Sequence, residues 1–227
     1  KPESKMERVY ENIAAAGQKK LEEVVFLMLK KIYKDYKSPN LCLSGGVALN
    51  SVMNGKILNS TPFKNIYIPP DPGDGGGAMG AAILGWQRHQ SKFVDNKSFT
   101  AYLGPGFSDD QIEDTLRNFN LKYQKYDRVK FLDVVSDLII KEKIIGWFQG
   151  RMEWGPRALG NRSIIASARR EKMKDIINAK VKHREMFRPF APVILDRYVD
   201  EYFIADKPLS PSAKYMLMVY PFTDKGK

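Results

Sequence analysis

The stretch from residue 150 to 163 reads GRMEWGPRALGNRS and combines arginines with turn-forming glycines and a proline. A second arginine-bearing stretch, VKHREMFRPFAP, follows at 181–192. Guanidinium groups carry a permanent positive charge on a planar fork that matches the geometry of phosphate and carboxylate groups. Because glycine and proline fix the course of such loops, the arginines are expected to form a preorganised pocket for a densely anionic small molecule. The candidate pocket residues are Arg151, Arg157, Arg162, Arg184 and Arg188.

The same arginines also fit a second interpretation, a charged surface on which each guanidinium group pairs with an acidic side chain. This interpretation suits Arg169 and Arg170 well. It suits Arg157 poorly, because proline and apolar residues flank it. In the pocket interpretation, Glu153 and Trp154 orient the arginines by ion pairing and by stacking.

A short motif, SGGVALN at 44–50, joins an apolar strand to the start of a helix. Gly45 and Gly46 have no side chains, so their backbone N–H groups can approach a phosphate or a ribose at the helix N-terminus. Asn50 lies in the first turns of the same expected helix. The pattern fits a nucleotide-binding turn and equally a plain tight turn between strand and helix, and the motif alone leaves both open.

A glycine-rich stretch, PPDPGDGGGAMGAA, covers residues 69–82. Asp71 and Asp74 precede consecutive glycines and a helix of small residues, where carboxylates suit a divalent cation or a ribose hydroxyl. The GxGxxG spacing is met formally at 75–80, but the preceding strand ends too far upstream for a dinucleotide fold. A glycine-rich loop with solvated aspartates stays open as the alternative. The candidates here are Asp74 for a metal and Gly76 for a nucleotide.

The composition is that of an ordinary globular protein, with 43% hydrophobic and 28% charged residues among 227. The sequence contains no apolar run long enough to span a membrane. The net charge is +11, and residues 141–190 hold thirteen Lys and Arg against five Asp and Glu. A basic module that binds nucleic acid is one explanation. Arginines embedded among Gly, Pro, Phe and Trp favour a pocket for small molecules instead, with neither nucleic acid nor a membrane as partner.

Cysteine and histidine are too sparse for a disulfide framework or for a metal cluster. The lone Cys42 lies in an apolar stretch, which predicts a core position and a reducing, cytoplasmic environment. His89 and His183 lack the spacing of metal ligands, and no nucleophile pattern of Ser, His and Asp is visible. Because the chain begins at Lys1, the lack of a secretory signal proves little.

Strand-like and helix-like segments alternate along the chain, which predicts an α/β fold in two units. Periodicity and capping residues place helices at 4–37, 47–58, 76–88, 108–118, 130–142 and 171–181. Apolar runs place strands at 41–44, 65–69, 121–125, 144–148, 163–167, 191–195 and 214–220. Residues 89–107 lose periodicity and contain an LGPG turn, which is typical of a linker.

Taken in this order, the motifs resemble those of the O-carbamoyltransferases of nodulation and antibiotic biosynthesis. The matching stretches are SGGVALN, PPDPGDGGGAMGAA, GRMEWGPRALGNRS and KHREMFRPFAPVIL, which together span residues 44–195. The resemblance implies the C-terminal part of an actin-like domain over 1–88 and a linker over 89–107. It further implies a YrdC-like twisted-sheet α/β domain over 108–227, truncated at its C-terminus.

Enzymes of this family make carbamoyl adenylate from carbamoyl phosphate and ATP, and a metal-bearing actin-like domain then transfers the carbamoyl group to an acceptor hydroxyl. The resemblance implies that the anion pocket contains Arg151, Arg157, Arg184 and Arg188. It places the nucleotide at Gly45, Gly46, Asn50, Gly76 and Arg162, and a divalent Fe or Mg ion at Asp74. The residues agree with this chemistry, because adenylation needs charge neutralisation and positioning more than a side-chain nucleophile.

The chain also departs from the family pattern. The family's metal site uses two histidines four residues apart, and no HxxxH sequence occurs here. We therefore expect a C-terminal portion of such an enzyme, unable to complete carbamoyl transfer alone. A carbamoyl- or threonylcarbamoyl-adenylate synthase of hydrogenase maturation or tRNA modification and the nucleic-acid module remain as alternatives. The acceptor and the oligomeric state, a homodimer included, stay open.

Overall fold

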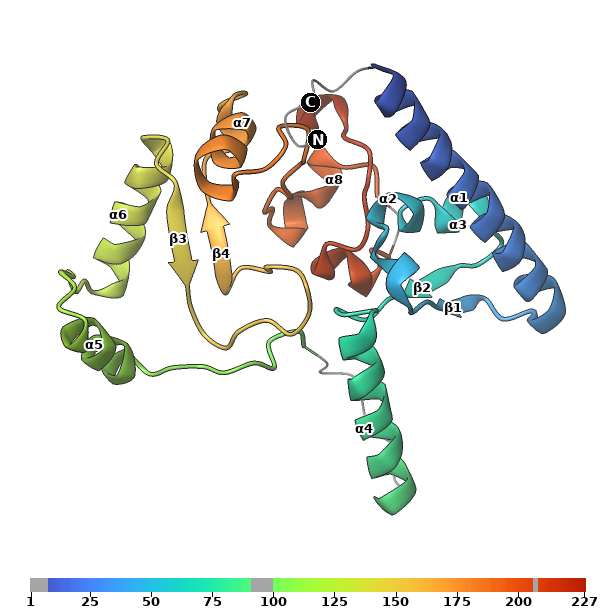
Figure 1. Ribbon diagram of the computed structural model, residues 1–227, viewed down its shortest axis with the longest axis horizontal. Coiled ribbons are helices and arrows are strands. Elements are labelled where there is room, and N and C mark those ends of the chain that lie inside the picture. The colour runs from blue at the N-terminus through green and yellow to red at the C-terminus, as the bar shows by residue number, and fades with distance from the viewer. Residues whose placement is uncertain (1–7, 91–99, 206–207) are drawn as a thin grey trace. The chain divides into compact units, whose positions relative to one another are not determined.

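The computed structural model describes residues 8–90, 100–205 and 208–227 (Figure 1). The chain forms two compact units: residues 1–95 and 196–227 make up unit 1, and residues 96–195 make up unit 2. Both units combine helices with a two-stranded sheet, and the expected alternation of helix and strand is absent from the described part of unit 2, where two helices precede two consecutive strands. The assignment of an actin-like and a YrdC-like domain stays a prediction.

Unit 1 begins with one long helix, α1 (Arg8–Tyr36), which matches the expected helix over its described part. The strands β1 (Asn40–Cys42) and β2 (Asn65–Tyr67) pair in parallel and form a two-stranded sheet. Leu41 lies opposite Ile66 in this register, and both side chains are buried. The expected strands at 41–44 and 65–69 are thus confirmed at nearly the same bounds.

The expected helix 47–58 is a series of short turns instead. They are the 3₁₀ helix η1 (Gly46–Leu49), α2 (Ser51–Asn54) and α3 (Ile57–Ser60). The side-chain oxygen of Asn50 accepts a hydrogen bond from the Met53 amide and caps α2. A separate helix therefore starts inside the range where a single continuous helix was expected. Gly55 then ends α2, and the main chain of Val219 lies so close that a side chain would not fit there.

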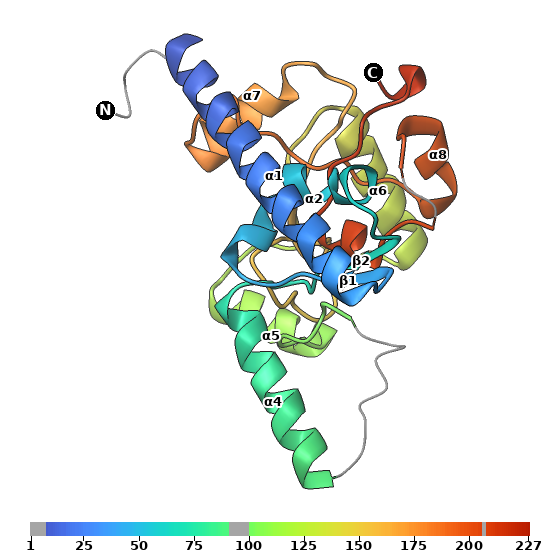
Figure 2. The same ribbon diagram turned by 90° about the vertical axis from the view of Figure 1, so that its right-hand side faces the viewer.

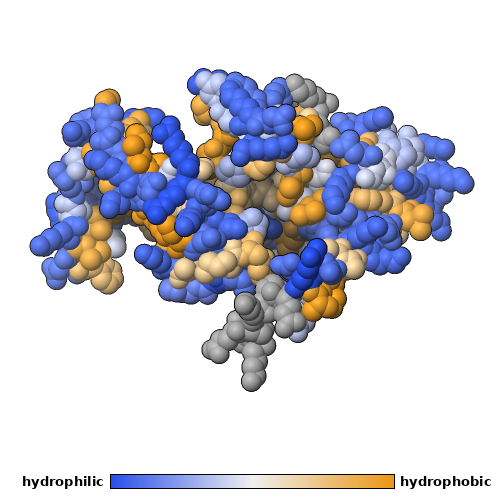
Figure 3. Space-filling model, turned by 90° about the horizontal axis from the view of Figure 1, so that it is seen from above, coloured by the Kyte–Doolittle hydropathy of each residue, from blue (hydrophilic) through white to orange (hydrophobic). Residues whose placement is uncertain are grey.

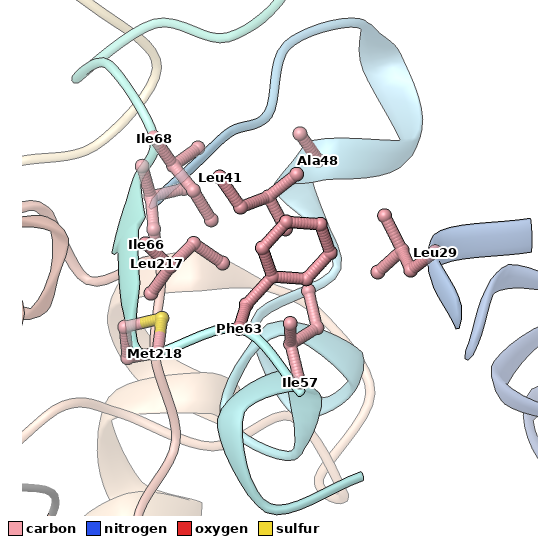
Figure 4. Close-up of a cluster of buried hydrophobic side chains, with 9 residues drawn as sticks. All are labelled: Leu29, Leu41, Ala48, Ile57, Phe63, Ile66, Ile68, Leu217 and Met218. Atoms are coloured by element: carbon pink, nitrogen blue, oxygen red, sulfur yellow. The ribbon is translucent and has the colours of Figure 1, made fainter. Parts of the chain in front are cut away.

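The core of unit 1 gathers apolar side chains from distant parts of the sequence (Figure 4). Leu29 reaches it from α1, Leu41 and Ile66 from the sheet, and Leu217 and Met218 from the end of the chain. Burial of these side chains supplies the main favourable free energy for closing the unit. The core therefore holds residues 196–227 to the N-terminal part of the chain.

In its described residues, the C-terminal segment contains short helical turns and an isolated antiparallel bridge between Phe203 and Phe222, but no strand. The turns are η4 (Asp196–Tyr198), α8 (Val199–Tyr202), η5 (Pro211–Tyr215) and η6 (Asp224–Gly226). The expected strand at 214–220 is wrong, because Met216 takes a left-handed conformation after η5 and its neighbours enter the core singly. The expected second domain, 108–227, therefore extends over unit 2 and this part of unit 1.

Helix α4 (Asp74–Gln90) extends away from the sheet of unit 1 and has no buried residue (Figures 1 and 2). Leu84 and Trp86 are both more than half exposed on it. Cys42 is exposed on β1, because it alternates with the buried Leu41. The expectation that Cys42 lies in the core was therefore wrong.

Unit 2 consists of helices and an antiparallel strand pair. Its helices are α5 (Asp109–Asn118), α6 (Arg128–Ile140) and α7 (Met173–Ile177), and α7 continues as a π-helical turn, η3 (Asn178–Lys182). Strand β3 (Ile145–Phe148) pairs with β4 (Arg162–Ile165), with Phe148 opposite Arg162. Ser108 and Gln111 form a complete capping box at the start of α5, which confirms the expected cap.

Two expected strands of unit 2 are not formed. Residues 121–125 are described and lie outside any sheet, and Tyr123 and Lys125 bond to Glu113 of α5 instead. Residues 191–195 are also described and irregular, since Pro189 and Pro192 remove amide donors that a strand ladder needs.

Much of the described surface is polar. Figure 3 shows a face on which hydrophilic residues predominate and hydrophobic ones emerge in separate patches. Within the described ranges, every helix is too short or too polar to cross a lipid bilayer.

Candidate anion-binding site

The arginine motif forms the connection between β3 and β4, residues 149–161, which we call the arginine loop (Figure 1). Two of its glycines, Gly155 with φ 116° and Gly160 with φ 104°, have backbone conformations that side-chain-bearing residues rarely adopt. The glycines that appeared in the sequence as turn formers are thus required by the course of this loop.

A buried carboxylate, Glu153, holds the arginine loop from inside. Its Oε1 accepts hydrogen bonds from the backbone N–H groups of Leu159 at 2.7 Å, Asn161 at 2.8 Å and Arg162 at 3.1 Å. Burial raises the pKa of Glu153, but these amide bonds outweigh it and the net pKa lies below its usual value. The carboxylate is therefore ionised at neutral pH and serves as an acceptor for the loop backbone.

Asn161 provides a second internal brace. It is 9% exposed, and its Nδ2 donates to the Arg151 carbonyl at 2.6 Å. Its Oδ1 accepts from Gln149 Nε2 at 3.1 Å, and the Gln149 amide donates to its carbonyl at 3.0 Å. Gln149 and Asn161 thereby join the two ends of the loop, directly beyond Phe148 and Arg162, the last residue pair of the β3–β4 ladder.

Arg162 bonds to the loop backbone through its guanidinium group. Its Nη1 donates to the carbonyls of Gln149 at 2.7 Å and Asn161 at 2.8 Å. Its Nη2 donates to the carbonyls of Gly150 at 3.2 Å and Pro105 at 3.4 Å. Arg162, which was predicted to contact a nucleotide, therefore bonds to both ends of the arginine loop in this structure.

Arg151 binds backbone as well, on a segment outside the loop. Its Nε donates to the Gly104 carbonyl at 2.9 Å and its Nη2 to the Leu103 carbonyl at 2.8 Å. The main chains pair beside it, because the Gly104 amide donates to Met152 and the Met152 amide donates to Pro105. A Cβ on Gly104 would lie 2.9 Å from the Met152 Cβ, so the two segments touch closely.

Residues 100–107, the described C-terminal part of the expected linker, therefore brace the arginine loop. We call residues 101–105 the brace segment. The Trp154 amide donates to the Ala101 carbonyl at 2.6 Å, and the Tyr102 hydroxyl donates to the Leu159 carbonyl at 2.9 Å. Residues 89 and 90 still belong to α4, and residues 91–99 lie outside the described part.

Arg157 lies at the far end of the arginine loop, between the exposed residues Pro156 and Ala158. Its side chain is half-buried. The sequence argument for Arg157 was that its apolar flanks disfavour a simple surface ion pair, and the structure places it in the part of the loop that Glu153, Asn161 and the brace segment hold in shape.

Arg184 and Arg188 lie after the π-helical turn η3, in the same unit. Arg184 Nε donates to Asn178 Oδ1 at 2.7 Å, and its guanidinium carbon lies 4.7 Å from the centre of the Phe190 ring. Arg188 forms an exposed ion pair with Glu185 at 2.7 Å. Asn178 is fully buried and its Nδ2 donates to the carbonyls of Met186 and Arg188, so a single amide side chain shapes this segment.

The predicted nucleotide turn is closely tied within unit 1. The Gly45 amide donates to the Pro72 carbonyl at 2.7 Å, and Gly45 has φ 98°. Around Gly46 an added Cβ would meet open space. Asn50 caps α2 and its Nδ2 donates to Gln18 Oε1 at 2.7 Å. The turn therefore brings the SGG motif next to the loop that precedes α4.

Asp74 and Gly76 lie in the first turn of α4. Asp74 is exposed, and the nearby Asp71 carboxylate accepts the Gly73 amide at 3.0 Å. Gly76 leaves no room for a side chain, since a Cβ would lie 1.9 Å from the Asp71 carbonyl oxygen. Among the described residues, no three His, Cys, Asp or Glu side chains are grouped as a metal site would require.

The structure groups the predicted site residues into three places. Arg151 and Arg157 lie in the arginine loop and Arg162 directly follows it as the first residue of β4. Arg184 and Arg188 share the segment after η3, and the remaining candidates lie in unit 1. Hollows of about 420 Å³ at residues 196–214 and about 240 Å³ beside α6 lie elsewhere, and neither is lined by a predicted site residue.

Sequence reasoning missed how the arginine loop is held. Glu153 was expected to pair with arginine side chains, whereas it binds backbone amides. Asn161 and the brace segment were not singled out. The LGPG turn was visible in the sequence, but nothing in it indicates that Gly104 packs on Met152, since that contact joins residues far apart in the chain.

Comparison with known proteins assigns the family. The family model described as "Carbamoyltransferase N-terminus" matches residues 2–83, and "Carbamoyltransferase C-terminus" matches residues 136–227. The chain is 43% identical to the uncharacterized protein sll1178 of Synechocystis sp. over 96% of its length, covering 36% of that protein. It is 39% identical to nodulation protein NolO of Bradyrhizobium diazoefficiens over 86% of its length, covering 36% of that protein.

A third relative, nodulation protein U of Rhizobium tropici, is 31% identical over 87% of the chain, which covers 33% of that protein. The chain thus spans about a third of the length of these relatives. The two family models describe the two ends of one kind of enzyme and match in the expected order along the sequence. On these grounds the chain belongs to the carbamoyltransferase family.

Proposed function

We propose that this chain is part of an ATP-dependent O-carbamoyltransferase. In the proposed reaction, water cleaves carbamoyl phosphate to carbamate and phosphate, and a carbamate oxygen then attacks the α-phosphorus of ATP to give carbamoyl adenylate and pyrophosphate. The carbamoyl group then passes to an acceptor hydroxyl with release of AMP. The observation that supports it most is the arginine loop, in which internal bonds to Glu153 and Arg162 fix the backbone around the half-buried Arg157.

The chemistry favours such a loop. Adenylation brings an acyl phosphate and a triphosphate together, so several negative charges must be neutralised at fixed positions before bonds change. Preorganised positive groups do this without reorganising during the reaction. A side-chain nucleophile is not needed, because water and carbamate supply the attacking oxygens, and phosphate and pyrophosphate are the leaving groups.

The proposal divides the arginines into residues that bind the ligand and residues that support the arginine loop. Arg157, Arg184 and Arg188 are assigned to the phosphate groups of carbamoyl phosphate and ATP. Arg151 and Arg162 donate to backbone carbonyls and support the loop. Gly45, Gly46 and Asn50 remain the proposed contacts of the nucleotide in unit 1, together with Gly76.

The proposal includes no metal-dependent step for this chain. Asp74 lies at the start of α4, and among the described residues it is not grouped with two further His, Cys, Asp or Glu side chains that could hold Fe or Mg. The acceptor is proposed as a small molecule with a free hydroxyl, with neither nucleic acid nor a membrane as partner. A cytoplasmic location, where carbamoyl phosphate and ATP are available, completes the proposal.

The test is a calorimetric titration of the chain with carbamoyl phosphate, with inorganic phosphate as the competing anion. We expect saturable binding of carbamoyl phosphate that Arg157→Ala weakens roughly 10- to 100-fold, the effect of removing a hydrogen bond to a charged group. The control is the double variant Lys172→Gln/Lys174→Gln, which removes two exposed charges of the same unit and is expected to bind like wild type.

Two outcomes would contradict the proposal. Carbamoyl phosphate that binds no better than phosphate would show that the loop is not built for the acyl phosphate. Equal losses in Arg157→Ala and in the lysine double variant, with a steep dependence on salt, would indicate a general polyanion surface.

A further inference from the structure

We infer that Glu153 is a positioning residue, whose buried carboxylate sets the shape of the arginine loop so that Arg157 faces its anionic ligand. The inference rests on the proposed function, because Arg157 is taken as a ligand-contacting residue. Glu153 itself touches no substrate in this scheme. It acts through the backbone that it binds.

The geometry of the acceptor carries the inference. A single carboxylate oxygen, Glu153 Oε1, accepts the amides of Leu159, Asn161 and Arg162. These amides lie on the far side of Arg157 in the sequence, whereas Glu153 lies on the near side. The carboxylate thus closes a ring of backbone that contains Gly155, Pro156, Arg157 and Ala158.

Other contacts also hold the loop: Asn161 Nδ2 donates to the Arg151 carbonyl, and the Trp154 amide donates to the Ala101 carbonyl. The Tyr102 hydroxyl holds the Leu159 carbonyl from outside, and Ser163 Oγ accepts the Gly160 amide at 3.0 Å. Glu153 joins the near side of Arg157 to three successive backbone donors beyond it, the amides of Leu159, Asn161 and Arg162. A change at Glu153 is therefore expected to move Arg157 more than it moves β3 and β4.

Direct participation of Glu153 in the chemistry fits less well. The side chain is buried, with 6% of its surface exposed, and the oxygen described above already accepts three amides. A general base needs an accessible oxygen within hydrogen-bonding distance of a substrate proton. The role that these contacts allow is to preorganise the loop, which lowers the cost of ordering Arg157 when the ligand binds.

The inference is tested by a double-mutant cycle on the affinity for carbamoyl phosphate, with Glu153→Gln, Arg157→Ala and the double variant. Glutamine keeps the size of the side chain but loses the negative charge that attracts three amides. We expect Glu153→Gln to weaken binding about tenfold in wild type and less than about twofold when Arg157 is already alanine, because coupled residues are not additive.

A ligand-free measurement accompanies the cycle. Amide hydrogen exchange of Leu159, Asn161 and Arg162 is expected to speed up at least about tenfold in Glu153→Gln, while the amides of β3 keep their protection. The control variant is Glu113→Gln, which removes another carboxylate of unit 2 that lies on the surface and binds Tyr123 and Lys125. It is expected to change neither the affinity nor the exchange of the loop amides.

The outcomes separate this inference from the proposed function. Wild type that binds carbamoyl phosphate and depends on Arg157, together with a Glu153→Gln variant that binds equally well, would overturn the inference alone. Additive losses in the cycle would also overturn it, since Glu153 would then act independently of Arg157. Wild type that fails to bind carbamoyl phosphate would overturn the proposed function and the inference with it.

A second variant covers the case in which Glu153→Gln does not fold. Gly160→Ala puts a methyl group into open space but forces a side-chain-bearing residue to φ 104°. It strains the same loop without touching the carboxylate. We expect Gly160→Ala to weaken the binding of carbamoyl phosphate when Arg157 is present. In the Arg157→Ala background it is expected to change the affinity less than about twofold. An unchanged affinity in the Gly160→Ala single variant would contradict the dependence of Arg157 on the shape of the loop.

Discussion

The guanidinium carbon of Arg162 lies 3.5 Å from the centre of the Phe148 ring, its partner across the β3–β4 pair. The same guanidinium group donates to four backbone carbonyls of the arginine loop and the brace segment. One side chain thus connects the end of the strand pair to both segments. A planar fork can do this, because it stacks on a ring with its face and donates through its edge.

Arg162→Lys is expected to loosen the arginine loop. A lysine ammonium group is a point charge and cannot stack on Phe148 while donating to carbonyls on two segments. We expect a loss of about 1 to 3 kcal/mol in the free energy of unfolding, measured by urea denaturation, from the hydrogen bonds left unmade. Arg169→Lys, at an exposed position of the same unit, is expected to change it by less than about 0.5 kcal/mol. Equal stabilities of the two variants would show that the carbonyl contacts of Arg162 contribute little.

The ion pair between Glu22 and Lys56 makes unit 1 sensitive to acid. Lys56 Nζ donates to both carboxylate oxygens at 2.8 Å, and Gln18 Nε2 donates to one of them. Burial raises the pKa of Glu22, but the hydrogen bonds from Gln18 and Lys56 and the charge of Lys56 outweigh it, so the net pKa is lowered. A lowered folded-state pKa gives stability that is present above the unfolded value and is lost as the pH falls through the folded one.

Lys56→Met is therefore expected to reduce the free energy of unfolding at about pH 7 by about 1.5 to 3 kcal/mol, the range for hydrogen bonds to charged groups. The difference from wild type is expected to shrink as the pH falls below the usual carboxyl pKa range and through the lowered pKa of Glu22, because Glu22 then becomes protonated. Urea denaturation at a series of pH values measures both. Lys20→Met, which breaks the exposed pair with Glu23, serves as the comparison and is expected to cost less than about 1 kcal/mol. A difference from wild type that is independent of pH would argue against the pair.

Gly76→Ala is expected to disrupt the start of α4. The added Cβ would lie 1.9 Å from the Asp71 carbonyl oxygen, so the backbone must shift. We expect a loss of about 1 to 3 kcal/mol, as for other overpacked sites, followed by thermal denaturation with circular dichroism. Gly77→Ala meets nothing within 4 Å and is expected to stabilise α4 by about 0.5 to 1 kcal/mol through helix propensity. Similar effects of the two substitutions would mean that the turn before α4 is not closely packed.

The Ser212 hydroxyl bonds to the backbone of Ile68, the residue that directly follows β2. Its Oγ accepts the Ile68 amide at 2.7 Å and donates to the Ile68 carbonyl at 3.0 Å, with all three groups buried. Ser212→Ala leaves both backbone groups without this partner, and we expect a loss of about 1 to 3 kcal/mol in unfolding free energy. Ser38→Ala removes the same two bonds to Asn40 at an exposed position and is expected to have a far smaller effect. If both cost the same, burial is not what makes the Ser212 bonds matter.

Local sequence patterns were enough to find the longer elements. The apolar period of α1 and the Ser108–Gln111 capping box of α5 are properties of neighbouring residues, and both helices occur where they were expected. Elements fixed by distant contacts were missed. The segment 214–220 has the composition of a strand, but Leu217 and Met218 enter a core that includes Leu29 of α1.

The site was predictable in its residues and less so in its construction. The grouping of Arg151, Arg157 and Arg162 on and directly after one loop follows from their spacing. Nothing local shows that Arg151 and Arg162 donate to carbonyls of residues 103–105, since those bonds join segments more than forty residues apart. The function of a charged residue depends on which partner it reaches, and that partner is set by the fold.

The division of unit 1 into two stretches of sequence has a consequence for the order in which the protein can fold as it is synthesised. Residues 96–195 are made between the two stretches, so Leu29, Leu41 and Ile66 must wait for Leu217 and Met218 before their core closes. At roughly 5 to 20 residues per second, the stretch of about 150 residues from Ile66 to Met218 takes on the order of 8 to 30 seconds. Unit 2 is contiguous and can form on the ribosome first, which makes the first-synthesised part of the chain the last to become native.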